Sequence, residues 1–317
     1  MKRLKQIKEK LFSRPVENQH GNGLFATMEE LVEQRKYVSY LKQYKAKTAS
    51  AIMAGDVKSA FKGRGMEFEE IRGYTFGDDV RDIDWRVTAR KLTPYTKLYA
   101  EEKDREIHIV LDLSPHMVFG TRNELKSVSA SKVASLLGWL CLENNDRFGC
   151  IVFDGNDTYS FKPQNDRANM MAILKKISQT GENILKTFKQ PQRERLSKPL
   201  QQLRQNIKSL STVFVVSDFN EFDEDMQKQL AALAKKARVY CVNVFDLLEE
   251  ISPKAGEYLA ENGRERLVFD TKSKEFQSEY KSYFAEKRER VRDFCMKFAM
   301  KYIEVRTDIS LFKQLKI

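Results

Sequence analysis

Short apolar runs and longer segments with apolar positions at helical spacing alternate along residues 106–250. The short runs are dense in Ile, Val, Leu and Phe and end in polar turns, which predicts buried strands. They are "EIHIVLDLS" (106–114), "RFGCIVFDG" (147–155), "STVFVVSDF" (211–219) and "RVYCVNVFD" (238–246). The segments between and beside them predict helices around 124–144, 168–178, 200–210 and 223–237. This alternation predicts an α/β fold with a doubly wound, mostly parallel sheet and helices on both faces.

The flanks of this region are patterned as well. The segment "TMEELVEQRKYVSYLKQYKAK" (27–47) predicts that the first 60 residues are mostly helical. Towards the C-terminus, "RLVFD" (266–270) is a candidate strand, antiparallel or at an edge, and a long amphipathic helix follows at about 275–300. The strand-like "YIEVRTD" (302–308) and a terminal helix complete the chain. We therefore expect an N-terminal helical segment (1–60), a charged block packed on the core (61–105) and an α/β domain with C-terminal helices (106–317).

Composition narrows the class of protein. The 317 residues are 41% hydrophobic and 32% charged, which is enough for a globular core, and they carry a formal net charge of +11. This excess gives either affinity for acidic surfaces or a lysine-rich solvated surface. No apolar run approaches the ~18 residues of a membrane span, and the basic N-terminus lacks a signal peptide's apolar stretch, so we expect a cytoplasmic protein. Leu4, Ile7 and Leu11 form a short amphipathic face suited to weak membrane-surface contact.

Cysteine, histidine and motif counts exclude several kinds of site. The four cysteines are far apart and never form a CxxC pair; three lie in apolar surroundings, which indicates buried free thiols in a reducing compartment. Three histidines are too few for a histidine-rich metal site. The phosphate-binding loop, the nucleophile elbow, HExxH and the dinucleotide fingerprint are all missing from the sequence, which lowers the expectation of an enzyme.

Polar side chains follow two of the predicted strands at the point where each strand ends. Asp112 closes the first strand, with Ser114 and His116 at alternate positions after it, and Asp218 follows the strand at 211–219. Ligands of a doubly wound sheet bind beyond the carboxyl ends of its strands, where the strand order reverses. We therefore expect Asp112 and Asp218 to lie close together. Carboxylates with hydroxyls suit a hard divalent cation such as Mg²⁺.

The stretch "GRGMEFEEIRGYTFGDDVRDIDWRVTAR" (63–90) concentrates arginines, carboxylates, glycines and aromatic residues. Its glycines predict turns rather than a regular helix. Because the planar guanidinium pairs with a carboxylate through two hydrogen bonds, the alternating charges predict a mutually satisfied network anchored by aromatic side chains. Such a network leaves few charges for a substrate, so we interpret this charged block as a partner-docking or purely structural element. Its candidate residues are Arg72, Tyr74, Gly77, Asp78, Asp79, Arg81, Asp84, Trp85 and Arg90.

The two acid-bearing turns resemble the von Willebrand factor A fold and its metal-ion-dependent adhesion site. That site is built from Asp-x-Ser-x-Ser, a distant Thr and a distant Asp, and Asp112, Ser114 and Asp218 match this pattern. The second serine is His116 in this chain, and the segment interpreted as the third loop offers Thr158 alone. The resemblance therefore implies a degenerate site, with Mg²⁺ or another divalent metal as the candidate cofactor. A histidine at the third position suits a transition metal better than Mg²⁺.

The charged block resembles the hallmark of the bacterial family called domain of unknown function 58, whose members run from such a block directly into a von Willebrand factor A-like core. The resemblance covers roughly residues 55–250 and extends to the C-terminal segment. Family members are commonly associated with MoxR-type AAA+ ATPases. The resemblance thus implies a non-enzymatic adaptor or co-chaperone for such an ATPase and its client, which binds its partner at the Asp112–Ser114–Asp218 rim and at the charged block.

Other interpretations stay open. Asp112, Ser114 and Asp218 would alternatively cap the turns after their strands, with no ligand at all. In a different functional class, Asp112 and Asp218 would hold Mg²⁺ in a phosphoesterase or nuclease, with the basic surface binding a polyanion. Nucleic-acid binding driven by the net charge is a third reading. The basic residues concentrate in the terminal helices, away from the two acids, so we favour the adaptor and do not expect a nucleic-acid partner.

Overall fold

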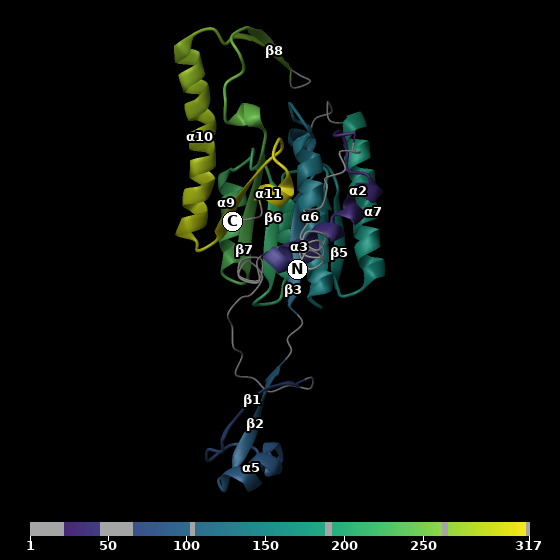
Figure 1. The fold of residues 1–317 in the computed structure, drawn as a ribbon. Helices are drawn as coiled ribbons and strands as arrows, with labels where there is room; N and C mark the ends of the chain where they lie inside the picture. Colours follow the sequence, from purple (N-terminus) through teal and green to yellow (C-terminus); the bar gives the residue numbers. More distant parts are fainter. Residues whose placement is uncertain (1–21, 45–65, 102–104, 188–191, 262–265, 315–317) are drawn as a thin grey trace, which may run out of the picture. The chain divides into compact units, whose positions relative to one another are not determined.

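The computed structural model describes residues 22–44, 66–101, 105–187, 192–261 and 266–314. Contacts divide the chain into two units, residues 1–48 with 105–317 and residues 49–104, and each unit is described by itself (Figure 1). The predicted amphipathic face of Leu4, Ile7 and Leu11 lies outside the described residues. The described helices of the N-terminal segment belong to the larger unit. Packing of the charged block on the core stays a prediction.

A six-stranded sheet forms the centre of the larger unit (Figure 1). Its strand order is β10-β7-β6-β3-β4-β5, and every neighbouring pair is parallel except β4 and β5. The chain leaves β3 in one direction and later returns to its other side with β6, so the sheet is doubly wound as predicted. The strands are β3 (Glu106–Asp112), β4 (Arg147–Phe153), β5 (Thr158–Gln164), β6 (Thr212–Ser217), β7 (Arg238–Phe245) and β10 (Lys301–Arg306).

The apolar pattern of the sequence identified the central strands of the sheet but only one of its two edge strands. The four strands predicted from apolar runs are β3, β4, β6 and β7 at its centre, and the strand-like segment at 302–308 contributes the edge strand β10. The loop predicted around Thr158 is wrong, because these residues form the antiparallel edge strand β5. Its side chains alternate between half-buried and exposed, and it contains Pro163, which a strand tolerates at an edge.

The candidate strand at 266–270 is antiparallel, as predicted, but it does not join the main sheet. It is β9 (Arg266–Asp270), which pairs with β8 (Glu257–Glu261) in a separate two-stranded sheet. The predicted long helix follows as α10 (Lys274–Lys297), and the terminal helix is α11 (Leu311–Gln314).

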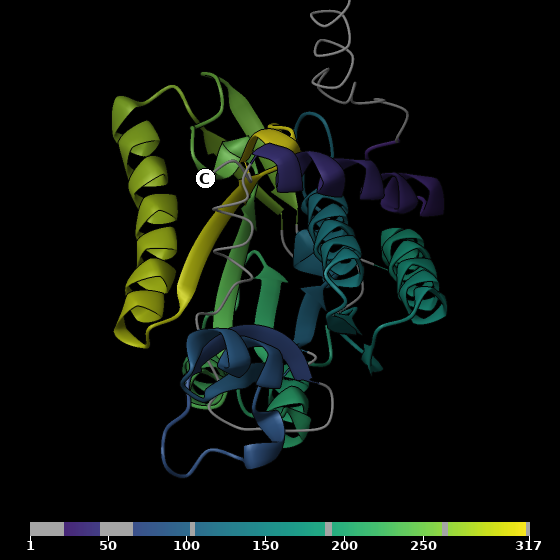
Figure 2. The ribbon, with the colours of Figure 1, turned by 60° about the horizontal axis from the view of Figure 1, so that its bottom comes forward.

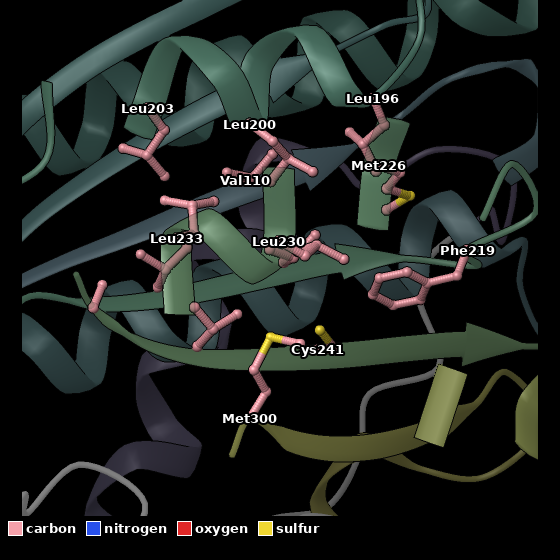
Figure 3. Close-up of a cluster of buried hydrophobic side chains, with 14 of the residues drawn as sticks. Val110, Leu196, Leu200, Leu203, Phe219, Met226, Leu230, Leu233, Cys241 and Met300 are labelled. Carbon is pink, nitrogen blue, oxygen red and sulfur yellow. The ribbon is translucent and has the colours of Figure 1, made fainter. Parts of the chain in front are cut away.

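Helices α8 (Ser197–Asn206) and α9 (Glu224–Ala234) cover one face of the sheet together with the C-terminal part of α10. Figure 3 shows how leucines from α8 and α9 meet Val110 of β3 and Cys241 of β7 in one buried cluster. Fully burying such a side chain contributes about 1.5–3 kcal/mol to folding, which explains why these strands are apolar throughout. All four cysteines are buried free thiols, including Cys295 on α10.

The opposite face is covered by α6 (Lys126–Glu143) and α7 (Arg167–Thr187). Helices α2 (Met28–Glu33) and α3 (Arg35–Tyr44) lie over α6, so that α6 is buried between the sheet and this outer layer (Figure 2). The carbonyl of Leu31 accepts hydrogen bonds from Ser135 Oγ at 2.5 Å and Trp139 Nε1 at 3.1 Å. The serines of α6 are buried even though serine is a polar residue. Their small side chains fit because every face of α6 packs against a neighbouring element rather than water.

The smaller unit is a charged hairpin with a short helix. Strands β1 (Met66–Gly73) and β2 (Tyr95–Glu101) pair antiparallel, and α5 (Trp85–Lys91) lies between them in sequence. Asp84 starts α5 by accepting hydrogen bonds from two backbone amides, and Leu92, with a left-handed φ of 58°, ends it. Among the described residues, 3₁₀ turns form at η1 (Val80–Asp82), η2 (Pro115–Met117) and η3 (Leu247–Glu249).

Candidate functional site

The carboxyl ends of β3 and β6 bring Asp112 and Asp218 together, as the sequence predicts. The two strands are hydrogen-bonded neighbours, with Leu111 opposite Val216. Asp112 is the last residue of β3 and Asp218 is the first residue after β6, and both are buried. We refer to this end of the sheet as the rim.

Asp112 is held by hydrogen bonds from its neighbours. Its Oδ1 accepts from the Ser114 amide at 2.9 Å, and its Oδ2 accepts from Ser217 Oγ at 2.6 Å. Ser217 Oγ in turn accepts from the amide of Phe219, whose φ of 49° is unusual for a bulky residue. Burial raises the pKa of Asp112, and the nearby charge of Asp218 raises it further. Asp112 therefore ties the turn after β3, whereas Ser114, the N-cap residue of η2, makes no side-chain capping hydrogen bond.

Lys126 supplies the positive charge of the rim. Its Nζ lies 2.7 Å from Asp218 Oδ2 and 3.1 Å from Glu249 Oε1, and its side chain is only 3% exposed. Burial alone lowers the pKa of Lys126, but Asp218 and Glu249 outweigh burial and raise it. For Asp218, burial raises the pKa, but the positive charges of Lys126 and Lys287 outweigh burial. The pKa of Asp218 therefore lies below its usual range. Lys126 and Asp218 thus form a buried, fully ionised pair, and the partly buried carboxylate of Glu249 is the third member of the group.

Sequence reasoning missed Lys126, although a signal was present. Lys126 is the first residue of α6, where the helix dipole disfavours a cation. It is followed by small and apolar residues that mark a buried helix. A lysine at the start of a buried helix needs a carboxylate partner, and the strand ends supply one.

The residues at the rim do not fit a divalent cation as they are arranged. The carboxylate of Asp218 receives the Lys126 ammonium on Oδ2 and the Asn220 amide on Oδ1, at 2.7 and 2.9 Å. Asp112 uses both of its oxygens as described above. Across the part of the chain that the structure describes, no group of three or more His, Cys, Asp or Glu side chains is placed to hold a metal ion.

His116 contacts Asn220 and Glu221, and not the metal-binding set with Asp112, Ser114 and Asp218 that the sequence suggested. Its Nδ1 lies 3.2 Å from Asn220 Nδ2, and its Nε2 lies 3.5 Å from Glu221 Oε1. Contact with Glu221 raises the pKa of His116, and burial opposes this effect in part. The ring therefore interacts with an amide and a carboxylate at a side chain exposure of 37%, and it is paired neither with a serine nor with a metal-ligating set.

A second buried carboxylate network lies after β7 and was not predicted. Asp246 accepts hydrogen bonds from Thr121 Oγ1 at 2.6 Å and Thr307 Oγ1 at 2.7 Å, as well as from the amides of Thr121 and Leu248. Asp246 thereby ties the loop after β3 to the end of β10. The signal was the same as for Asp112, because Asp246 ends an apolar run with "VFD".

The charged block contains part of the predicted network. Arg72 pairs with Asp78 at 2.8 Å, and Asp78 also accepts from the amide of Thr75. The Tyr74 hydroxyl donates to the carbonyl of Asp78 at 3.3 Å. Gly77 has a φ of 106°, so this position of the turn favours glycine, as the sequence indicates.

The rest of the charged block is more exposed than predicted. Asp79 and Asp84 direct their carboxylates to backbone amides as helix caps, and Asp84 also pairs with Lys97 at 3.4 Å. Arg81 and Arg90 are exposed, and neither makes an ion pair with another described residue. Trp85 is 66% exposed, and the anchoring of the block to the domain by its aromatic side chains stays a prediction. These arginines and the tryptophan therefore stay available at the surface, because short aspartates reach local amides more readily than they reach a distant guanidinium.

Comparison with known proteins decides the family. The family described as "Protein of unknown function DUF58" matches residues 70–290, more than half of the chain. The chain belongs to the DUF58 family. Relatives of this DUF58 protein include the uncharacterized proteins Rv1480 of Mycobacterium tuberculosis and Mb1516 of Mycobacterium bovis, each 24% identical over 217 residues, which is 68% of this chain and 67% of the relative.

Solved structures similar to this DUF58 chain include von Willebrand factor A proteins. The conserved hypothetical protein BatB from Bacteroides thetaiotaomicron is 17% identical, with a TM-score of 0.41, over 67% of this chain and 95% of that one. The SpRpn10 VWA domain is 11% identical, with a TM-score of 0.35, over 67% and 94%. The order of the six strands and the antiparallel edge strand themselves agree with the von Willebrand factor A-like core that the resemblance implied.

The DUF58 match covers residues of both units, so the charged block and the sheet are parts of one family architecture. Of the helices in the described ranges, none combines the length and apolar character that a bilayer span requires.

Proposed function

We propose that this DUF58 protein is a non-enzymatic, cytoplasmic adaptor that acts with a MoxR-type AAA+ ATPase and binds its partner at the rim and at the charged block. The family resemblance supports the ATPase as the partner. The observation that carries the interaction role is the division of charges at the rim. The buried side chains of Asp112, Asp218 and Lys126 are satisfied within the protein, whereas the polar groups around them are half-buried or, at Asn220, exposed.

The accessible groups of the rim favour an acidic partner. Lys287 of α10 donates to Asn220 Oδ1 at 2.7 Å, and Asn220 also contacts His116. Arg288, the next residue of α10, donates to the carbonyl of Glu249 at 2.6 Å. Phe119, which is 40% exposed, adds an apolar contact surface beside these groups. The centre of its ring lies 5.5 Å from Lys126 Nζ. Two cationic side chains and a histidine with a raised pKa would receive a carboxylate of the partner.

The same arrangement disfavours the phosphoesterase or nuclease alternative. That reaction needs Asp112 and Asp218 to hold a metal ion, and their oxygens are already bonded to Ser217, Lys126 and backbone amides. His116 contacts Asn220 and Glu221 rather than a nucleophile. We therefore retain the adaptor as the proposed function.

Binding to the purified MoxR-type ATPase of the same organism tests this proposal. Biolayer interferometry should show saturable binding that Lys287→Ala and His116→Ala each weaken by about tenfold, mainly through slower association. Lys186→Ala is the matched control, because Lys186 is an exposed lysine of α7 with a single i,i+4 partner, Glu182. Equal affinities for all of these proteins would remove the rim from the interface, and no binding by the wild type would remove the ATPase as the partner.

The purified adaptor should hydrolyse neither ATP nor phosphodiesters. A malachite-green assay and a nuclease assay with Mg²⁺ check this expectation, with the ATPase alone as the positive control. Turnover that survives further purification and is lost in Asp218→Asn would contradict the adaptor and restore the metal-dependent alternative.

A further inference from the structure

The Lys126 ammonium is bonded to Asp218, the distant acid of the site at which the resemblance implies a divalent cation. We propose that Lys126 is a built-in cation that replaces this metal ion, so that the rim of this protein is assembled without metal. The inference concerns how the rim is built, and it holds whichever partner the rim binds.

The charges at the rim require a cation. Asp112, Asp218 and Glu249 are three carboxylates at or just after the ends of β3, β6 and β7. Lys126 contacts two of them directly, and the side chain of Lys287 is the further positive charge that acts on Asp218. An unpaired carboxylate in such a buried position is strongly disfavoured. Without Lys126, the buried end of the sheet would carry an excess of negative charge that a bound ion would have to neutralise.

A metal ion and Lys126 compete for the same oxygen atom. Mg²⁺ binds carboxylate oxygens at about 2.1 Å and requires near-octahedral oxygen ligands. Asp218 Oδ2 already has the ammonium at 2.7 Å, and Oδ1 has the Asn220 amide at 2.9 Å. A divalent ion on Asp218 would also lie beside the positive ammonium, which raises the cost of binding further. Lys126 therefore excludes the metal as well as replacing its charge.

The replacement changes how the rim meets a partner. An adhesion-site metal keeps an open coordination position that a partner's carboxylate fills. The side chain of Lys126 is 3% exposed and already has two carboxylate partners, so it offers no such position. Recognition must then use the exposed groups around it, and chelators should leave it unchanged.

Metal titration of the wild type and of charge variants tests the proposal. Isothermal titration with Mg²⁺ and Mn²⁺ and thermal melts with either ion or EDTA are recorded for the wild type, Lys126→Ala and Lys126→Ala/Asp218→Asn. The matched control is Lys132→Ala. Lys132 lies on the same helix, is partly buried and also pairs with two carboxylates. Its partners are Glu124 and Glu30 rather than the carboxylates after β6 and β7.

We expect no saturable binding and no shift in Tm for the wild type. Lys126→Ala should lose stability without metal and regain it with a divalent ion, with a Tm rise of about 5 °C at a hundredfold excess over Kd. Lys126→Ala/Asp218→Asn should show no such rise because a ligand carboxylate is missing. Lys132→Ala should lose stability and gain none from metal.

Two results would overturn the proposal. One is saturable metal binding by the wild type. The other is a Lys126→Ala protein that melts like the wild type or that stays destabilised with every cation. If Lys126→Ala does not fold under any condition, Lys126→Ala/Asp218→Asn decides: recovery of the fold shows that the ammonium neutralises Asp218, and failure contradicts the proposal. Loss of ATPase binding in the assay above would leave these outcomes unchanged, so the two proposals fail separately.

Discussion

At the scale of single residues, Asp246 illustrates how a buried carboxylate becomes stabilising. Burial raises its pKa, but hydrogen bonds from Thr121, Leu248 and Thr307 outweigh burial, so that its pKa lies below the model-peptide value of 3.8. A folded-state pKa below the unfolded one contributes stability that is present above pH ~4 and is lost as the pH falls through the folded-state pKa.

Asp246→Ala should therefore lower the free energy of unfolding by about 2–4 kcal/mol at pH 7, because it leaves two threonine hydroxyls and two amides without their acceptor. The difference from the wild type should shrink below pH 4. Urea unfolding at several pH values measures it, with the exposed Asp157→Ala as the control. A difference that is constant down to pH 3 would mean that Asp246 acts through packing rather than through its charge.

Asp112 leads to a second prediction at this scale. Asp112→Ala removes the acceptor of the Ser217 hydroxyl and the Ser114 amide and should cost about 1–3 kcal/mol of unfolding free energy. Asp112→Asn should cost less, because its amide oxygen accepts one of these bonds and a buried charge is removed. Denaturant titration compares the two variants. If Asp112→Ala instead keeps the wild-type stability and loses the partner, the carboxylate serves recognition and the tied turn is incidental.

At the scale of elements, two glycines of neighbouring helices offer a matched test of packing. A Cβ at Gly138 of α6 would lie 2.6 Å from Met170 Cε and 2.9 Å from a ring atom of Phe148, whereas a Cβ at Gly181 of α7 would meet Phe25 at an ordinary 3.6 Å. Alanine is the better helix former by about 0.5–1 kcal/mol.

Gly181→Ala should therefore raise the Tm, and Gly138→Ala should lower it by the equivalent of about 1–3 kcal/mol, because α6 and α7 must move apart. Differential scanning calorimetry of both variants gives the comparison. Stabilisation by both substitutions would show that Met170 rearranges freely and that the α6–α7 contact is looser than described.

Elements also show what the sequence can and cannot predict. Apolar runs identified β3, β4, β6 and β7 because both faces of these strands are buried, so each side chain carries the signal. β5 was missed because an edge strand with a proline and polar side chains has the composition of a loop. The neighbouring positions of Asp112 and Asp218 followed from topology alone. The long-range partners of Lys126 and Asp246 could not be predicted, because they join segments 61 to 125 residues apart through side-chain geometry that no local pattern records.

At the scale of the whole molecule, the two units differ in how they are stabilised. The larger unit has a core on both sides of its sheet. In the smaller unit, Thr96 is the one buried side chain among residues 71–97, and Phe76, Trp85 and Leu92 are largely exposed. A two-stranded hairpin without a core is marginal in water.

Replacing residues 49–104 by a Gly/Ser linker should therefore leave a cooperatively folded protein with a Tm close to that of the full chain, whereas a peptide of residues 49–104 should not fold alone. Circular dichroism melts of both proteins check this. A non-cooperative melt of the shortened chain would mean that the charged block stabilises the sheet, in line with the packing predicted from the sequence. The shortened chain also shows whether the ATPase needs the charged block.

The outer layer formed by α2 and α3 has a consequence for how the protein is made. Leu31 docks on Ser135 and Trp139, which follow it by 104 and 108 residues. At translation rates of about 5–20 residues per second, the ribosome needs about 5–20 s to make the helix that receives these N-terminal turns. Throughout that interval Leu31 and Val38, fully buried in the finished fold, are open to solvent on the nascent chain. A ribosome stalled before residue 143 would present this unsatisfied surface to chaperones, so these early residues wait for more than 100 further residues before they can reach their native contacts.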